Sequence, residues 1–206
     1  MTKPVSPIIV VATRNAGKLR EFQTLLRPLN CGILCLADFA AETQGVEIEE
    51  SGCTFAENAR LKAVGYSRLV HFPVLADDSG LEVESLDGRP GIHSARYAGQ
   101  DASDADRIQK LLGEMENRGG ERNARFVCAL ALARNGETIA ESEGSCSGVI
   151  IREARGAKGF GYDPVFLLSE LGKTFAELDE AEKNQYSHRA HAVAALQPLI
   201  IGSLKV

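Results

Sequence analysis

Residues 13–18 combine a lysine with small and polar residues, immediately after an apolar run of the chain. Backbone N–H groups and the dipole at the start of a helix favour an anion, and an ammonium group adds a positive charge for a phosphate. The segment is not a Walker A motif, because that motif needs glycine where Ala12 stands and Ser or Thr where Leu19 stands. Two interpretations remain: an ordinary helix start with a solvated lysine, or a phosphate-binding loop made of Thr13, Arg14, Asn15, Ala16, Gly17 and Lys18.

Two adjacent carboxylates, Asp77 and Asp78, precede Ser79 and Gly80 at the end of a predicted strand. Adjacent carboxylates repel each other unless a cation or hydrogen bonds compensate. Mg²⁺ is the natural cation here, because proteins hold it with one or two carboxylates while substrate phosphates supply further ligands. The acidic pair at 49–50 can supply another ligand. The alternative is a polar β-turn, in which Asp, Ser and Gly are common.

A glycine-rich loop contains two aromatic rings and a carboxylate in the run Phe160, Gly161, Tyr162 and Asp163. A nucleotide base that stacks on an aromatic ring gains about 1–3 kcal/mol. Binding residues occur disproportionately on loops, and packing alone does not demand aromatic rings there. The alternative is a turn whose aromatic side chains anchor it in the core, and the residues alone do not choose between the two.

Polar side chains gather again near the C-terminal end, where Lys183 is followed by Ser187, His188 and Arg189. Their position at a predicted helix start fits polar contacts with a ligand, although Ser187 can also serve simply as the helix cap. His191 lacks the spacing to His188 that a metalloprotease helix needs, so we expect it to be structural or exposed.

Hydrophobic periodicity predicts the elements that must position these groups. We expect strands at 7–13, 33–36, 73–76, 81–86, 124–134, 138–140, 147–151 and 165–168, with 77–80 breaking the third from the fourth. We expect helices from 16, over 54–69, from 103, from about 177 and from 187, the last kinked or ended by Pro198. Asn135-Gly136 predicts a hairpin turn, and the segments 40–51 and 88–99 are expected to be irregular. The pattern predicts an α/β fold with a central twisted mixed sheet flanked by helices.

Composition limits the classes of protein to consider. With 44% hydrophobic and 25% charged residues, the chain can bury a substantial core, and we expect one domain over residues 1–206. The net charge of −5 argues against nucleic acid or an anionic membrane as a partner. Five cysteines at scattered positions suit a reducing compartment, and a zinc site at Cys31 and Cys35 lacks further ligands at suitable spacing.

No apolar run approaches the roughly 20 residues that a transmembrane helix needs, and Met1 to Pro7 has no signal-peptide pattern. These features predict a cytoplasmic protein.

Six segments, taken in this order, closely resemble the inosine triphosphate pyrophosphatase family and its bacterial dITP/XTP branch. They are the loop at 13–18, the run 54–59 with Lys62, the run 76–81, the run 90–97, the loop 159–164 and the run 187–189. Each segment by itself is weak evidence for the family, whereas six in order across almost the whole chain are highly specific. The resemblance implies two lobes with a substrate cleft between them and a homodimer.

The resemblance also implies roles for single residues. Residues 13–18 and Lys62 bind the triphosphate, Ser79 contacts the substrate, and Asp78 is tied to Mg²⁺ and to activation of water. Glu50, in preference to Glu49, is the second metal ligand. The base-side pocket consists of Phe160, Gly161, Tyr162, Asp163, Lys183, His188 and Arg189. Arg14 departs from the family pattern, which usually has a small residue or Asn, so it either adds a phosphate contact or points to solvent.

These parts imply Mg²⁺-dependent hydrolysis of ITP, dITP, XTP or dXTP to the monophosphate and pyrophosphate. Asp78 serves either as general base or by orienting a metal-bound water, and the sequence does not choose between these roles. Donors from His188, Arg189 and the backbone of the Phe160 loop, aimed at the 6-carbonyl, explain rejection of the adenine amino group. The alternatives are a non-catalytic nucleotide-binding module and a pyrophosphatase for other modified nucleotides.

Overall fold

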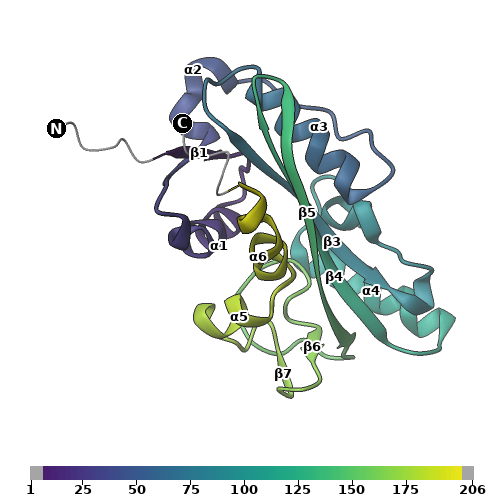
Figure 1. Cartoon of the computed structure of the whole chain (residues 1–206). Coiled ribbons are helices and arrows are strands. Elements are labelled where there is room, and N and C mark those ends of the chain that lie inside the picture. Colours follow the sequence, from purple (N-terminus) through teal and green to yellow (C-terminus); the bar gives the residue numbers. More distant parts are fainter. Residues whose placement is uncertain (1–6, 201–206) are drawn as a thin grey trace. The chain divides into compact units, whose positions relative to one another are not determined.

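A seven-stranded mixed sheet in the order β2-β1-β3-β4-β5-β6-β7 organises this computed structural model, which describes residues 7–200 (Figure 1). Strands β2 and β3 pair with β1 in parallel, whereas β6 pairs antiparallel with both β5 and β7. The predicted α/β class with a mixed sheet is confirmed. The strands are β1 Ile8–Val11, β2 Gly32–Cys35, β3 Val74–Val83, β4 Asn123–Arg134, β5 Glu137–Ile150, β6 Phe166–Leu168 and β7 Lys173–Thr174.

Six α-helices occur in the described part of the chain. They are α1 Ala16–Leu25, α2 Ala40–Thr43, α3 Phe55–Ser67, α4 Asp104–Arg118, α5 Glu180–Tyr186 and α6 His188–Ile200. Short 3-10 turns occupy Arg27–Leu29, Leu36–Phe39, Glu84–Leu86 and Gly91–Arg96. Side-chain caps define several starts: Thr54 accepts a hydrogen bond from the Glu57 amide, and Ser103 forms a capping box with Asp106.

The described residues divide into two compact units. Unit 1 contains residues 7–78, 128–144 and 189–200, and unit 2 contains Ser79–Val127 and Ser145–His188. Strands β3, β4 and β5 each contribute residues to both units. A single domain over residues 1–206 and a substrate cleft between two lobes stay predictions.

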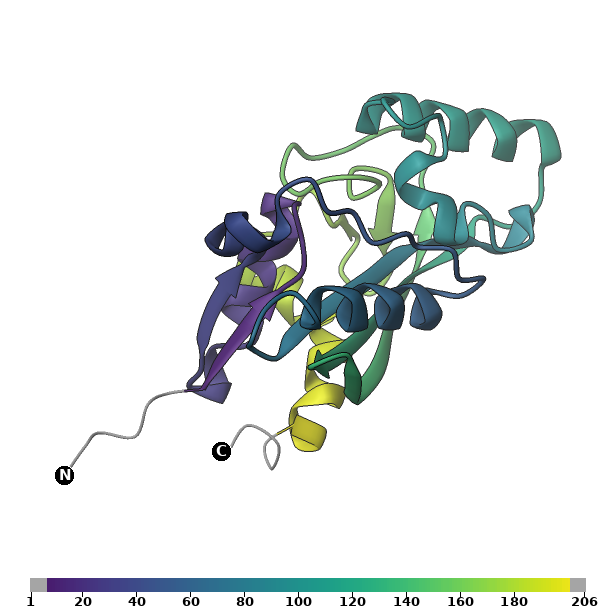
Figure 2. The same cartoon turned by 90° about the horizontal axis from the view of Figure 1, so that it is seen from above.

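The core of unit 1 forms where helices α1 and α6 cover one face of its strands. Side chains alternate along a strand, so Ile9 and Val11 share that face and Val10 points to the other. Helix α3 lies on this second face (Figure 2). All three strand residues are at most 1% exposed, so the strand is buried on both faces. The cluster on the first face comprises Ile9, Val11, Phe22, Leu26, Leu75, Cys128, Leu130, Leu132, Ala192, Val193, Leu196 and Ile200.

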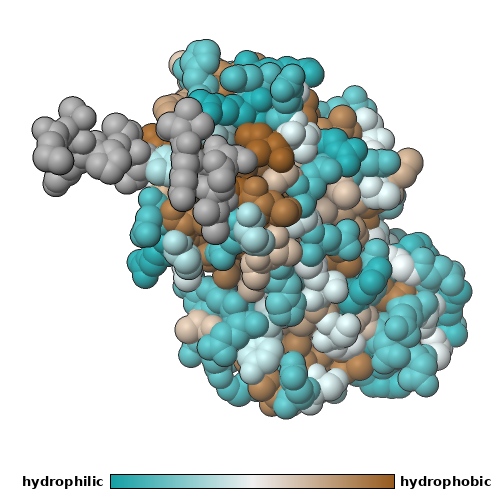
Figure 3. All heavy atoms as spheres, in the orientation of Figure 1, coloured by the Kyte–Doolittle hydropathy of each residue, from teal (hydrophilic) through white to brown (hydrophobic). Residues whose placement is uncertain are grey.

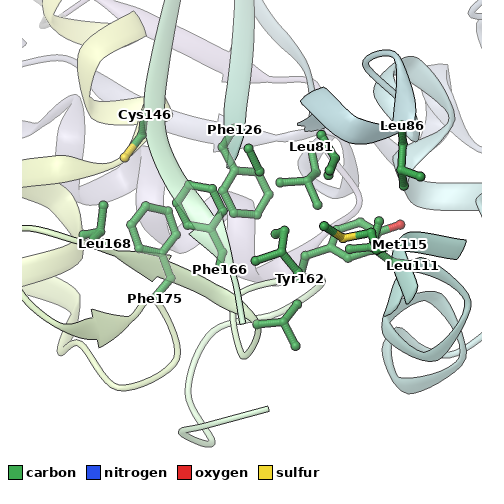
Figure 4. Packing of buried hydrophobic residues seen from close by; sticks show 14 of the residues in the cluster. Leu81, Leu86, Leu111, Met115, Phe126, Cys146, Tyr162, Phe166, Leu168 and Phe175 are labelled. Carbon is green, nitrogen blue, oxygen red and sulfur yellow. The ribbon is translucent and has the colours of Figure 1, made fainter. Parts of the chain in front are cut away.

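Aromatic rings form the centre of the unit 2 core (Figure 4). The ring centroid of Phe126 lies 4.6 Å from that of Phe166 and 5.7 Å from that of Phe175. Leu111 and Met115 of α4 pack into the same cluster, since they lie four residues apart on one face of the helix. This core positions the loop before β6, because the buried Tyr162 ring belongs to it.

Two predicted interruptions of the sheet were wrong. Residues 77–80 do not break a strand or form a turn, because β3 continues through them from Val74 to Val83. Likewise, β5 runs without a break from Glu137 to Ile150 after the predicted turn at Asn135-Gly136. The residues of β4 do not alternate between buried and exposed positions along most of the strand, since those from Phe126 to Ala133 are all buried. Long-range partners, described below for Asp77 and Asp78, make the polar segment of β3 compatible with a strand.

Smaller differences concern helices. The segment 40–51, expected to be irregular, begins with α2, and the loop 88–99 contains the 3-10 turn Gly91–Arg96. Helix α5 starts at Glu180, because Asp179 caps it with Glu182 as the reciprocal partner. Pro198 does not end α6, which continues to Ile200.

No helix within the described residues is long and apolar enough to cross a membrane. Hydrophilic residues cover much of the face that Figure 3 shows. Most of Met1 to Pro7, on which the expectation of no signal sequence partly rests, lies outside the described residues.

Candidate functional site

The predicted phosphate loop joins β1 to the N-terminus of α1 in unit 1. Asn15 is the N-cap, and its side-chain oxygen accepts a 3.0 Å hydrogen bond from the Lys18 amide. Thr13 Oγ1 accepts a 3.2 Å bond from the Asn15 amide, so the turn is held before any ligand binds. A buried strand followed by a capped helix start is the local arrangement that presents backbone N–H groups to an anion.

Lys18 does not extend into solvent as the plain helix-start interpretation requires. Its ammonium forms a 2.7 Å ion pair with Asp77 Oδ2, and only 2% of the Asp77 side chain is exposed. Burial by itself raises the pKa of Asp77, but Lys18, Arg189 and Lys62 outweigh burial and hold that pKa well below its usual value. Asp77 is therefore a fixed negative charge that anchors the lysine.

Asp78 lies in a different environment although it follows Asp77 directly. It is 9% exposed, and its Oδ2 accepts a 3.0 Å hydrogen bond from Nδ2 of the Asn58 side chain on α3. Burial raises its pKa, and the nearby Glu50 adds to the rise, while the Asn58 bond and Lys62 only partly oppose it. A cation near this carboxylate would therefore stabilise its ionised form.

Lys62 and Glu50 form a second ion pair beside this carboxylate. Lys62 Nζ lies 2.8 Å from Glu50 Oε1. Burial lowers the pKa of Lys62, but Asp77, Glu50 and Asp78 together raise it above its usual value, so the lysine stays charged. Glu50 is half-buried and oriented into the cluster, whereas Glu49 is exposed. This difference favours Glu50 of the two glutamates.

The donor set fits Mg²⁺ better than a softer metal. Within residues 7–200, no group of three or more His, Cys, Asp or Glu side chains is arranged to hold a metal ion. The acidic oxygens near one another are those of Asp78 and Glu50. Mg²⁺ suits such a site, because it prefers oxygen ligands and keeps waters and substrate phosphates in its remaining positions.

Two arginines of unit 1 have contacts that differ from expectation. Arg14 Nη2 donates a 2.8 Å hydrogen bond to the Val46 carbonyl, so its head group is neither directed only to solvent nor committed to the phosphate loop. Arg189, expected beside the base, lies 2.8 Å from Glu21 through Nη1 and 3.7 Å from Asp77 through Nε. Burial lowers the pKa of Arg189, but these two carboxylates outweigh burial and raise that pKa, and the guanidinium supports the Asp77–Lys18 pair.

The expected base-side residues of unit 2 meet around Phe160. The Phe160 amide donates a 2.9 Å bond to Asp163 Oδ2, and Lys183 Nζ forms a 2.7 Å ion pair with the same oxygen. The Lys183 ammonium also lies 4.9 Å from the centroid of the Phe160 ring, at the distance of a cation–π contact. Asp163 and Lys183 are both buried, whereas Phe160 is half-buried. One ring thus remains partly accessible and held in place.

Tyr162 and Gly161 have structural contacts in the same loop. The Tyr162 hydroxyl donates a 3.0 Å bond to the Ser94 carbonyl, and its ring is 4% exposed, so this aromatic anchors the loop in the core. The Gly161 amide donates a 2.7 Å bond to Asp104 Oδ2. The Phe160 and Gly161 amides both donate to carboxylates in this structure, and contacts of this loop's backbone amides with the base stay a prediction.

His188 and Ser79 lie at the boundaries of unit 2. The His188 ring is 2% exposed and stacks on Phe126, with centroids 4.8 Å apart and planes at 14°. Ser79 is half-buried within β3, directly after Asp78. His191 is exposed, as expected. Both His188 and Ser79 stay predicted substrate contacts.

Four residues of these clusters were not expected from the sequence. Asp77 was assigned no role of its own, and Glu21, Asn58 and Asp104 were not selected. Asn58 lies on α3 shortly after the Thr54 cap, among the buried residues of the helix. A buried side-chain amide needs a hydrogen-bond partner, so this residue type at this position indicates a polar contact. Glu21 offers no such signal, since its partner Arg189 is 168 positions away.

Comparisons with known proteins identify the family of this chain. The family model described as Ham1 family matches residues 9–199. The chain belongs to the Ham1 family.

Relatives in this family carry a consistent name. A protein of Geobacillus kaustophilus named dITP/XTP pyrophosphatase is 53% identical over 189 residues, covering 91% of this chain and 91% of that protein. One of Bacillus subtilis with the same name is 45% identical over 192 residues, covering 93% and 96%. A solved HAM1 protein from Coxiella burnetii matches with a TM-score of 0.84 and 41% identity, covering 96% of this chain and 98% of that one. The resemblance inferred from the six segments is therefore confirmed.

Proposed function

We propose that this chain hydrolyses noncanonical purine nucleoside triphosphates, ITP, dITP, XTP and dXTP, to the monophosphate and pyrophosphate with Mg²⁺. The observation that carries the proposal is the cluster in unit 1, where Lys18 and Lys62 flank Asp77 and Asp78. Relatives named dITP/XTP pyrophosphatase align with more than nine-tenths of the chain, which supports the reaction and the substrate class.

The phosphate side of the reaction needs neutralisation of the charge on the pyrophosphate leaving group. The neutralising positive charge comes from the backbone amides of residues 13–18, at the start of α1, and from the ammonium groups of Lys18 and Lys62. Asp77 holds Lys18 by a 2.7 Å ion pair, and Arg189 offsets the charge of Asp77. The lysine is thus positioned in advance, which lowers the entropic cost of binding the transition state.

Asp78 acts on water. Its pKa is raised by burial, and a carboxylate with a raised pKa is a better proton acceptor than an exposed one. It either accepts the proton of the attacking water or orients that water, and both roles remain part of the proposal. Mg²⁺, held by Asp78 and Glu50, would neutralise phosphate charge and make the water more acidic.

The base side belongs to unit 2. The half-buried Phe160 ring offers a stacking face, while Asp163 and Lys183 fix its backbone and its ring. Donors from Lys183 and His188 at the purine 6-carbonyl would leave an adenine amino group facing another donor, and such a mismatch rejects an analogue strongly. Gly161, Tyr162 and Asp163 act through the shape of the loop.

The proposal treats residues 1–206 as one domain. A homodimer and a cytoplasmic location stay predictions, and light scattering on the purified protein tests the first of them.

The deciding experiment incubates the protein with ITP, XTP, dITP, ATP and GTP, with and without Mg²⁺, and measures pyrophosphate and orthophosphate separately. We expect pyrophosphate from the first three only when Mg²⁺ is present. Orthophosphate as the first product would place the cut at another bond and refute the proposal. Binding of ITP without turnover would favour a nucleotide-binding module. Turnover confined to nucleotides with other modified bases would favour a pyrophosphatase for those nucleotides.

A further inference from the structure

Asp104, the first residue of α4, connects this helix to the loop that carries Phe160. Its Oδ2 accepts the 2.7 Å hydrogen bond from the Gly161 amide. Its other oxygen, Oδ1, lies 2.6 Å from Nη1 of Arg107, one turn along the helix. Each carboxylate oxygen therefore has a different donor, and a charged acceptor makes the bond to Gly161 stronger than a bond between neutral groups.

The peptide group between Phe160 and Gly161 is fixed by these contacts. The Phe160 amide donates to Asp163, the Phe160 carbonyl accepts a 3.3 Å bond from the Asp163 amide, and the Gly161 amide donates to Asp104. Of these three bonds, only the one from Gly161 reaches a residue outside the loop. Gly161 has a φ of +62°. Because glycine adopts positive and negative φ about equally well, its backbone has many alternative conformations when that bond is absent.

The same loop has a second external support through its next residue. Tyr162 donates to the Ser94 carbonyl, and the Ser94 hydroxyl accepts a 2.9 Å bond from the Leu81 amide of β3. Tyr162 is buried in the core, whereas Phe160 and Gly161 are half-buried. Asp163 and Lys183 hold Phe160 from within the same loop and from α5, and Asp104 adds the contact that ties the Gly161 amide to α4.

We propose that Asp104 is a positioning residue that sets the orientation of the Phe160 ring for the purine base, with Arg107 fixing the carboxylate of Asp104. The inference rests on the proposed function, because it assigns a base to that ring. Asp104 touches the loop backbone and acts on the substrate only through it. Its loss affects binding of the base more than the chemical step.

The test compares Asp104→Ala with Asp106→Ala. Both residues lie in the first turn of α4, but the carboxylate of Asp106 contacts Ser103, in the capping box, and not the loop. For Asp104→Ala we expect the Gly161 amide to exchange with deuterium about tenfold faster, and KM for ITP to rise about three- to tenfold with kcat nearly unchanged. Asp106→Ala weakens the helix cap but leaves both quantities as in the parent chain.

A second variant separates positioning from folding. Asp104→Asn keeps an oxygen that can accept from Gly161 but lacks the charge that binds Arg107, so its KM should fall between those of the parent and Asp104→Ala. If the parent turns over ITP while Asp104→Ala keeps the parent KM, or keeps the parent exchange rate at Gly161, the inference is wrong. A parent chain that does not act on ITP would refute the proposed function instead.

Discussion

At the scale of single residues, the two neighbouring aspartates of β3 show how environment assigns different roles to the same side chain. Asp77 is surrounded by Lys18, Lys62 and Arg189, which lower its pKa despite burial. Asp78 has an amide partner in Asn58 and a nearby glutamate, and burial raises its pKa. These environments suit the first aspartate to a structural charge and the second to the reactive role proposed above.

This difference predicts opposite outcomes for the two isosteric variants. Asp77→Asn removes the charge that Lys18 and Arg189 face, so we expect it to lower the free energy of unfolding by about 3 kcal/mol. Asp78→Asn removes a carboxylate whose ionised form is disfavoured by burial, so the free energy of unfolding should stay the same or rise. Its kcat should fall about 100- to 10,000-fold.

Urea unfolding and initial rates on ITP measure both quantities on the same preparations. Equal destabilisation by the two variants would contradict the assignment of separate roles. So would an Asp78→Asn enzyme with more than a tenth of the parent kcat.

At the scale of elements, the loop before β6 depends on glycines in the left-handed region. Gly159 has a φ of +75° and Gly161 a φ of +62°, conformations that cost other residues about 1 kcal/mol or more. Their surroundings differ. A Cβ at Gly159 would overlap the carboxylate of Asp163, whereas one at Gly161 meets no atom within 4 Å.

These surroundings make Gly159→Ala and Gly161→Ala a matched pair. Both introduce the same backbone strain, but Gly159→Ala also displaces the carboxylate that holds Phe160 and Lys183. We expect KM for ITP to rise about tenfold or more in Gly159→Ala and about threefold or less in Gly161→Ala. Steady-state kinetics on both variants measures the two KM values for ITP. Equal KM values would mean that the position of the Asp163 carboxylate does not depend on the absence of a side chain at residue 159.

At the scale of the whole molecule, the residues proposed for the phosphates and those proposed for the base belong to different units. Unit 1 holds the ionic cluster around Asp77 and Asp78, and unit 2 holds Phe160 with Lys183. The ion pairs around this cluster include Lys18–Asp77, Lys62–Glu50 and Arg189–Glu21. We therefore expect a divalent cation to be needed for the proposed reaction but not for folding.

Metal removal tests this separation. We expect EDTA to abolish pyrophosphate release from ITP, while the Tm measured in the absence of nucleotide shifts by less than about 2 °C. Added Mg²⁺ should restore the full rate. A large fall in Tm on chelation would show that the metal stabilises the fold, and persistent activity would show that the reaction proceeds without it.

Local sequence patterns were sufficient for much of the fold. The helix start at 103, the turn at Asn135-Gly136 and the apolar stripe after Ala16 were each predicted from the sequence, because the determining contacts lie within a few residues. Six ordered segments carry the resemblance, and their residues alone are sufficient to identify the family. The same patterns placed Lys18 at the start of α1 and Phe160 in the loop before β6, whereas they placed Asp78 in a break between strands and not within β3.

Only the tertiary structure decided how polar residues at distant positions compensate one another. A run of two aspartates, a serine and a glycine predicts a turn, yet it is part of β3, because Lys18, 59 positions away, meets Asp77. Arg189 contacts Asp77 for the same reason, since Glu21 and Asp77 attract its charge, and its contact with the base stays a prediction. Burial makes an uncompensated charge costly, and the partner that removes this cost comes close only when the chain has folded.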